Sequence, residues 1–191
     1  DVCSSDLTNL IDLFIRDFKG DPKRVYFSGS SNGGMMTYRL SCDIPEKIRA
    51  IAPFVSTISP GVAREFANAK PIPIIITSGT ADSVIKWNGG TIKVTRTPVI
   101  LSGDENVAYW VARNGTKKKA KITHLPDVEP GDNSTVEIQH YKGKNDVILY
   151  KIIGGAHTHP TLRAPGKALV KGLNMDYNSF ERVWDFMMSY K

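Results

Sequence analysis

Short runs of mostly apolar residues, each about the length of one strand, constrain the fold of this chain more than any other feature. Four such runs occur: "RVYFS" at 24–28, "IRAIAPFVS" at 48–56, "IPIIITS" at 72–78 and "DVILYKII" at 146–153. A strand that is apolar on both faces is buried on both faces, as in a parallel sheet covered by helices. These runs therefore predict buried parallel strands.

Segments with helical periodicity alternate with these strands. Helices are predicted at 7–18, 32–42, 62–69 and 103–114. A last helix is predicted from Phe180, Val183, Trp184 and Met187, spaced i, i+3, i+4, i+7, with Asn178 as its N-cap. The order predicts an α/β fold, with a mostly parallel sheet and helices on both faces.

The segment between the fourth helix and the last strand has a different pattern. Here "KAKITHL" and "TVEIQHY" alternate polar and apolar residues, which is typical of a hairpin. His124 and His140 lie in these two runs, and we expect them at the surface or in cross-strand pairs.

Composition narrows the class of protein further. The chain has 191 residues, of which 41% are hydrophobic, so we expect one domain with a substantial core. Its net charge is +6, but the one dense basic run, Lys117 to Lys119, follows Asn114-Gly115 and indicates a solvated loop. We predict neither a nucleic-acid nor a membrane partner, and two cysteines are too few for a disulfide scaffold.

Residues 29–33, "GSSNG", form a G-x-S-x-G motif between the first predicted strand and the helix that follows it. This placement is that of a nucleophile elbow, a sharp turn that presents a serine hydroxyl. Ser31 is therefore the candidate nucleophile, and Gly29 and Gly33 are expected to remove side chains that would collide at the turn. The Asn32 N–H, at the start of the helix, is the candidate donor to an oxyanion.

A serine nucleophile needs a base, and the base needs a group that orients it. Asp82 follows the strand at 72–78, and His157 follows the strand at 146–153. Because the carboxyl ends of parallel strands lie at one edge of the sheet, we expect both side chains near Ser31. The alternative for Asp82 is a structural role in the turn beside Gly79.

His159 is the rival of His157 for the role of base, and we expect it to line the pocket instead. The "HTH" sequence could also bind a metal, but no carboxylate or cysteine with ligand spacing accompanies it. The prediction is a site that needs neither metal nor cofactor.

The three motifs together resemble the extracellular polyhydroxybutyrate depolymerase and feruloyl esterase family of α/β-hydrolases. They are "GSSNGGMM" (29–36), "SGTADSVIKWNGG" (78–90) and "GGAHTHP" (154–160). The resemblance implies an α/β-hydrolase fold with Ser31, Asp82 and His157 as nucleophile, orienting acid and general base. It also implies a serine esterase that forms an acyl-enzyme, acts on a polyester or on a feruloyl or acetyl ester of a plant polysaccharide, and is secreted or periplasmic.

The chain departs from the family pattern in the expected pocket wall. Trp87 stands where the family usually has tyrosine, and His159 where it has tryptophan. Together with Ser30, these residues are the candidate substrate-binding residues. Trp87 could stack on an aromatic acyl group or a sugar, or it could be a half-buried structural residue.

The resemblance also implies strands ahead of the nucleophile strand and a loop that supplies a second oxyanion donor. We interpret residues 1–7, "DVCSSDL", as a non-native leader, and residues 8–191 as the C-terminal part of a single α/β-hydrolase catalytic domain that lacks its N-terminal strands. The nucleophile strand would then form an exposed sheet edge, through which self-association is expected. Two other functions stay open: a catalytically inactive carbohydrate- or polymer-binding relic of the fold, and an acyltransferase.

Overall fold

A six-stranded sheet with the strand order β1-β2-β3-β8-β7-β6 organises the chain. The computed structural model describes residues 2–92, 97–162 and 169–190. Four neighbouring strands are parallel: β1 (Tyr26–Ser30), β2 (Ala50–Phe54), β3 (Ile74–Gly79) and β8 (Val147–Ile153). The antiparallel strands β7 (Thr135–Tyr141) and β6 (Lys121–His124) complete the sheet.

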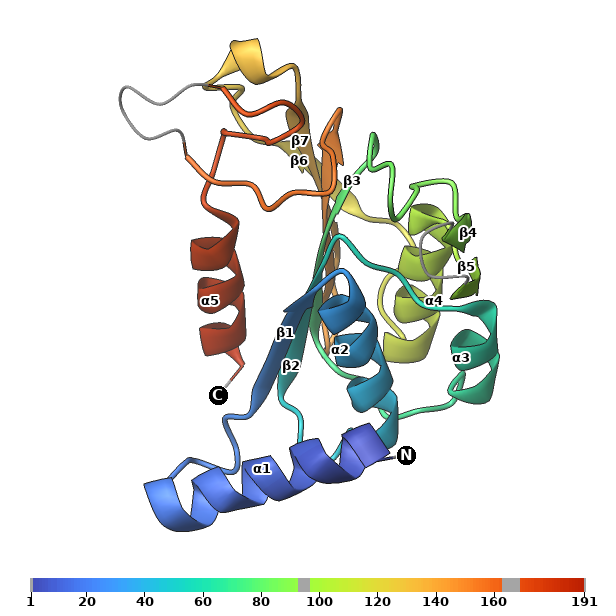
Figure 1. Ribbon diagram of the computed structural model, residues 1–191, viewed down its shortest axis with the longest axis vertical. Helices are drawn as coiled ribbons and strands as arrows, with labels where there is room; N and C mark the ends of the chain where they lie inside the picture. The colour runs from blue at the N-terminus through green and yellow to red at the C-terminus, as the bar shows by residue number, and fades with distance from the viewer. Residues whose placement is uncertain (1, 93–96, 163–168, 191) are drawn as a thin grey trace.

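Helices cover both faces of the sheet, which confirms the predicted α/β fold (Figure 1). On one face lie α2 (Asn32–Asp43), the short α3 (Pro60–Glu65) and α4 (Gly103–Asn114). On the other face lies α5 (Ser179–Ser189), whose N-cap Asn178 accepts hydrogen bonds from the Phe180 and Glu181 amides, as predicted. The helix α1 (Val2–Phe18) lies across the end of the sheet opposite the loops that follow β3 and β8.

The core consists of two main apolar layers, one on each face of the sheet. In β3, Ile74 and Ile76 pack with Trp110 of α4, whereas Ile75 packs with Val183 and Phe186 of α5. Successive side chains of a strand point to opposite faces, so a strand covered on both sides must be apolar at every position. This is why the sequence pattern identified the central strands.

Several boundaries differ from the expected ones. The first strand ends at Ser30 rather than at residue 28, and α3 begins at Pro60 because Ser59 caps it by accepting a hydrogen bond from the Val62 N–H. A two-stranded antiparallel sheet of β4 (Gly90–Ile92) and β5 (Thr97–Ile100) was not predicted. Strands of three and four residues are too short to show a clear alternation of polar and apolar residues.

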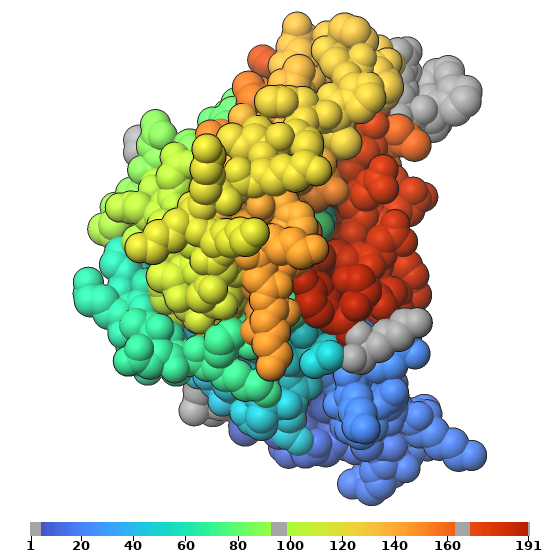
Figure 2. All heavy atoms as spheres, turned by 180° about the vertical axis from the view of Figure 1, so that it is seen from behind, coloured from blue at the N-terminus to red at the C-terminus, as the bar shows by residue number. Residues whose placement is uncertain are grey.

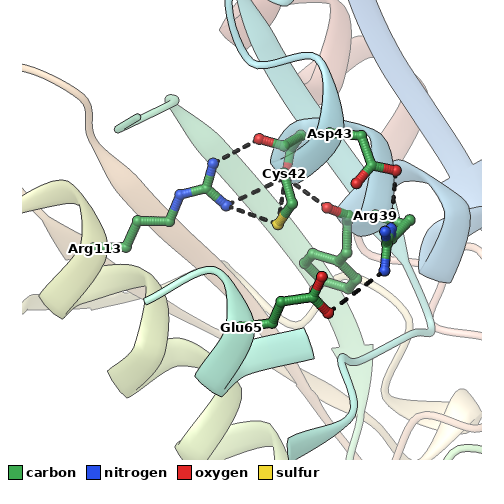
Figure 3. Close-up of polar contacts among 7 residues, drawn as sticks. Arg39, Cys42, Asp43, Glu65 and Arg113 are labelled. Atoms are coloured by element: carbon green, nitrogen blue, oxygen red, sulfur yellow. Dashed lines mark hydrogen bonds and ion pairs between the residues drawn. The ribbon is translucent and has the colours of Figure 1, made fainter. Parts of the chain in front are cut away.

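Arg113 at the end of α4 anchors the end of α2 (Figure 3). Its guanidinium is buried and donates to the backbone oxygens of Ser41 at 2.6 Å and Lys70 at 2.9 Å, and to Cys42 Sγ at 3.3 Å. On the other side of α2, Arg39 pairs with Asp43 at 2.8 Å and with Glu65 of α3 at 3.8 Å. These contacts fix the helix that begins at the predicted nucleophile.

The first strand and the first helix are only partly covered by the rest of the chain. β1 forms one edge of the sheet, and on α1 the side chains of Leu10, Phe14 and Phe18 are exposed. Seen from behind in Figure 2, the blue atoms of this part of the chain project from the lower end of the molecule. Self-association through the β1 edge stays a prediction. None of the helices in the described ranges is long and apolar enough to span a bilayer.

Two neighbouring glycines of α2 give a direct test of how closely this helix packs on the sheet. A Cβ at Gly34 would lie 2.5 Å from Ser56 Cβ, whereas a Cβ at Gly33 would meet nothing within 4 Å. We expect Gly34→Ala to lower the free energy of unfolding by about 1–3 kcal/mol through overpacking. Gly33→Ala, the matched control, should leave it unchanged or raise it by up to about 1 kcal/mol. Denaturant unfolding measures both, and equal stability of the two variants would contradict this packing.

Candidate active site

Ser31 lies at a sharp turn between β1 and α2 and has a strained backbone. Its φ is 53° and its ψ is −114°, a region that residues with a side chain rarely occupy. A Cβ at Gly29 would lie 2.3 Å from the Gly33 carbonyl oxygen, so the turn requires glycine at position 29. Gly33 was also expected to remove a colliding side chain, and this was wrong, because a Cβ there would meet nothing within 4 Å. The turn is tight because the backbone of Gly33 lies against Gly29.

The elbow exposes one backbone donor at the start of α2. The Ser31 N–H donates to the Phe54 carbonyl at 3.0 Å, which ties the elbow to the end of β2. Asn32 is the first residue of the helix, and its N–H has no acceptor among the described residues. A free N–H at a helix N-terminus favours negative charge, so it has the chemistry of an oxyanion donor.

Asp82 and His157 are joined by a hydrogen bond of 2.7 Å between Asp82 Oδ2 and His157 Nδ1. The Asp82 side chain is 1% exposed and that of His157 26%. The other oxygen of Asp82 accepts from the amides of Val84 at 2.8 Å and Ile85 at 2.9 Å. Asp82 therefore makes the contacts that both interpretations expect, since one oxygen binds two amides of the turn and the other binds the imidazole.

The other ring nitrogen of His157, Nε2, differs from Nδ1 in its contacts. With Nδ1 held by Asp82, no described residue forms a hydrogen bond with Nε2, and this includes Ser31. Catalytic hydrogen bonds are often long before a substrate binds and shorten in the reacting complex. The imidazole of His157 is thus held by Asp82, but it forms no hydrogen bond with Ser31 in the described structure.

His159 is placed differently from His157. Its Nε2 lies 2.6 Å from Ser30 Oγ, and its ring stacks on Phe54 at 4.9 Å and meets the ring of Phe180 edge-on at 5.3 Å. Burial, and then the neighbouring His157, lower the pKa of His159 below its usual 6.5. Among the described residues it has no carboxylate partner, so the geometry favours His157 over His159 as base.

Trp87 is placed against the start of α4. Its Nε1 donates to Asp104 at 3.3 Å, the Lys151 ammonium lies 4.6 Å from the ring centroid, and a Cβ at Gly103 would collide with the ring at 2.6 Å. These contacts account for a half-buried tryptophan without a ligand. Its predicted role in substrate binding stays a prediction, as does that of Ser30.

Two features of the site were not found from the sequence. Phe54 and Phe180 flank His159, but in the sequence each is one more apolar residue of a strand or a helix. Val55 has φ 40°, an outlier for a β-branched residue, and it immediately follows the residue that holds the elbow. No local pattern distinguishes these residues, because their contacts form only when the strands align.

The remaining histidines lie in the β6–β7 part of the sheet, as expected. His124 faces Glu137 across the strands at 3.6 Å, and His140 contacts Asp146 at 2.8 Å. Over the residues that the structure describes, no three His, Cys, Asp or Glu side chains come together as a metal site would require.

The molecule has a cavity at the loops that follow β3 and β8 and another beside α4. One of about 630 Å³ adjoins the residues just before Asp82 and His157, with Ala81, Gly154 and Ala156 in its wall. Another of about 500 Å³ runs beside α4 and is walled by Val107, Val111 and Tyr141, among others. Ser31, Asp82 and His157 are not among the wall residues of these two cavities.

Comparison with known proteins relates the chain to esterases. No family model matches it. It is 32% identical over 141 residues to feruloyl esterase B of Piromyces equi, which covers 72% of this chain and 25% of that protein. It is 26% identical over 179 residues to the putative esterase NocK of Nocardia uniformis subsp. tsuyamanensis, covering 88% of this chain and 52% of that one.

A third relative and one solved structure agree with these. The chain is 37% identical over 81 residues to the bifunctional acetylxylan esterase/xylanase XynS20E of Neocallimastix patriciarum, covering 42% of this chain and 12% of that one. The acetyl xylan esterase from Aspergillus awamori superposes with a TM-score of 0.52 at 16% identity, over 81% of this chain and 62% of that one. The chain thus has a fold of the α/β-hydrolase type and spans no more than about half the length of the curated relatives that it matches.

The strain at Ser31 can be measured as stability. Glycine tolerates this backbone and alanine does not, so Ser31→Gly should be more stable to unfolding than Ser31→Ala by about 1 kcal/mol. Ser30 lies in a β-strand, where glycine is destabilising. At this position we therefore expect Ser30→Ala to be more stable to unfolding than Ser30→Gly. Denaturant unfolding of the four variants measures this, and alanine more stable than glycine at both positions would refute the strained turn.

The lowered pKa of His159 predicts a pH dependence of stability. As the pH falls through about 6.5, the unfolded chain takes up a proton at this residue before the folded chain does, so folding stability is lost. We expect the melting temperature of the wild type to fall, relative to that of His159→Phe, as the pH goes from 8 to 5. A difference between the two proteins that stays constant across this range would show that the folded state does not disfavour charge at His159.

Proposed function

We propose that this chain carries the catalytic residues of a serine carboxylic ester hydrolase that works through an acyl-enzyme. The observation that carries the proposal is the hydrogen bond of 2.7 Å between His157 Nδ1 and Asp82 Oδ2, formed at the same sheet edge as the strained turn at Ser31. A buried carboxylate, an oriented imidazole and a serine at a strand-to-helix turn are the components that convert a hydroxyl into a nucleophile. The relatives that are named esterases support the same activity.

In the proposed reaction, Ser31 Oγ attacks the ester carbonyl carbon while His157 Nε2 takes the hydroxyl proton. Asp82 holds the Nδ1–H and stabilises the imidazolium that forms. The carbonyl oxygen becomes an oxyanion, to which the Asn32 N–H donates. The intermediate collapses as His157 returns the proton to the leaving alcohol, and this leaves the acyl group on Ser31.

Water then completes the cycle. His157 takes a proton from a water molecule as the water oxygen attacks the acyl carbonyl carbon. The second intermediate collapses as His157 returns this proton to Ser31 Oγ, which breaks the acyl–Oγ bond and releases the acid. Nothing in these steps calls for a metal or a cofactor.

For the substrate, we propose a feruloyl or acetyl ester of a plant polysaccharide. The support comes from the relatives named feruloyl esterase and acetylxylan esterase. An enzyme for a polymeric substrate must meet it outside the cell, which favours export of the protein. The sequence motifs also allow a polyester substrate, so the substrate test below compares hydrolysis of the polysaccharide esters with hydrolysis of a polyester.

Loss of the nucleophile should abolish turnover while the fold persists. We expect Ser31→Ala to lower kcat on p-nitrophenyl acetate by at least about 10³-fold, with His157→Ala close to it, because the groups act as a unit. Ser189→Ala, which removes a hydroxyl that bonds Phe186 at the end of α5, is the control and should retain full activity. Equal hydrolysis by Ser31→Ala and the wild type would end the proposal.

Covalent trapping separates the ester hydrolase from the other two functions. A fluorophosphonate probe should label Ser31, as located by mass spectrometry of the peptide, whereas a binding relic would stay unlabelled. Transfer of the acetyl group to added sugar or glycerol in preference to water would identify an acyltransferase. Release of ferulate or acetate from arabinoxylan, compared with release of hydroxybutyrate from the polyester, decides the substrate.

A further inference from the structure

We propose that His159 is a positioning residue, which holds the loop that carries His157 over the nucleophile strand by binding the Ser30 side chain. The loop at residues 154–160 is here called the base loop. This inference rests on the proposed function, since it concerns the distance between the base and the nucleophile. It assigns a role to His159, which stands where the family that the motifs resemble has tryptophan.

The base loop must cross the sheet to reach the nucleophile. It leaves the sheet at the end of β8, and Ser31 follows β1, which is three strands away in the order β1-β2-β3-β8. With neighbouring strands about 4.8 Å apart, the crossing spans about 14 Å. A loop of this reach needs contacts along its path to hold one imidazole in a reactive position.

The first contacts hold the base loop over β3. The Gly155 carbonyl accepts from the Ala81 N–H at 2.9 Å, and Asp82 binds His157. Both partners follow β3 directly. They hold the Nδ1 side of the imidazole and the backbone of Gly155 over β3, which is two strands from the nucleophile strand β1.

The next contacts come from His159 and hold the base loop over β2 and β1. Its ring stacks on Phe54, the last residue of β2, with 4.9 Å between the ring centroids. Its Nε2 lies 2.6 Å from Oγ of Ser30, the last residue of β1. One side chain thus bridges the two strands that the Asp82 contact does not reach.

The helix α5 closes this contact from the outside. Phe180, in its first turn, meets the His159 ring edge-on at 5.3 Å and contacts Phe54 at 5.4 Å. The Ser179 N–H donates to the carbonyl of Pro160, the last residue of the base loop, at 3.0 Å. The ring of His159 is therefore confined by two aromatic residues while its nitrogen binds Ser30.

The consequence is that Ser30 and Ser31 have separate tasks. Ser30 fixes the base loop to the end of the nucleophile strand, and Ser31 is left for His157, to which it has no hydrogen bond in the described structure. A misplacement of about 1 Å between reacting groups can cost about 10²-fold in rate. Loss of the Ser30–His159 contact should therefore act on the chemical step and not on substrate affinity.

The test uses variants that separate the ring from the hydrogen bond. His159→Phe keeps a ring between Phe54 and Phe180 but cannot bind Ser30, and Ser30→Ala removes the partner. For each we expect kcat on p-nitrophenyl acetate to fall about 10- to 100-fold with KM changed less than about threefold. The double variant should be no slower than the slower single variant, because both remove one interaction.

A conservative variant distinguishes positioning from a loss of packing. Ser30→Thr keeps the hydroxyl and should recover most of the kcat that Ser30→Ala loses, while melting temperatures establish that each variant is folded. Should His159→Phe fail to fold, the Ser30→Ala and Ser30→Thr pair carries the test alone.

The outcomes separate this inference from the proposed function. Unchanged kcat in His159→Phe and Ser30→Ala, or additive losses in the double variant, would overturn the positioning role in an enzyme that still depends on Ser31. Labelling of Ser30 instead of Ser31 by the fluorophosphonate would make Ser30 and His159 the reacting pair, and would overturn both.

Discussion

The backbone of Ser31 is the constraint on which the rest of the site depends. Its positive φ costs about 1–3 kcal/mol, so the surrounding structure must hold it in place. The amide of Ser31 is bound to the end of β2, and α2 packs on the same strand so closely that Gly34 has no room for a side chain. At its far end, α2 is bound by Arg113. The strain at one residue is thus maintained by contacts along a whole helix.

Asp82 and His157 lie at the same edge of the sheet as Ser31, because the carboxyl ends of the parallel strands all lie at that edge. Asp82 follows β3 and His157 follows β8, two neighbouring strands, so their side chains meet although 75 residues separate them. Asp82 is buried, which would be costly for a carboxylate without partners. Two amides of its own turn and one imidazole bind it, so the residue that stabilises the turn is also the residue that holds His157, the proposed base.

Much of the fold and of the elbow could be predicted from the sequence, because the physical causes act between residues that are close in the chain. The buried strands were visible because burial on both faces makes every position apolar, and the elbow because a sharp turn restricts residue 29 to glycine. The helix at 103–114 was placed correctly from its apolar face, and in the structure Ser102 and Glu105 form a capping box at its start while Gly115 caps its end. What the sequence could not provide was the pairing of side chains between elements, such as Ser30 with His159 or Phe54 with Phe180.

His157 and His159 show why residue type alone does not assign a role. They are two positions apart in one loop, yet one binds a buried carboxylate and the other lies between two phenylalanines and binds a neutral hydroxyl. Burial between the two rings, and then the neighbouring His157, disfavour a charge on His159 and lower its pKa. The proposed base is thus the histidine whose Nδ1 is held by a carboxylate, and the proposed positioning residue is the one enclosed by aromatic rings. Two residues of the same type differ in proposed role because the strands beneath them offer different partners.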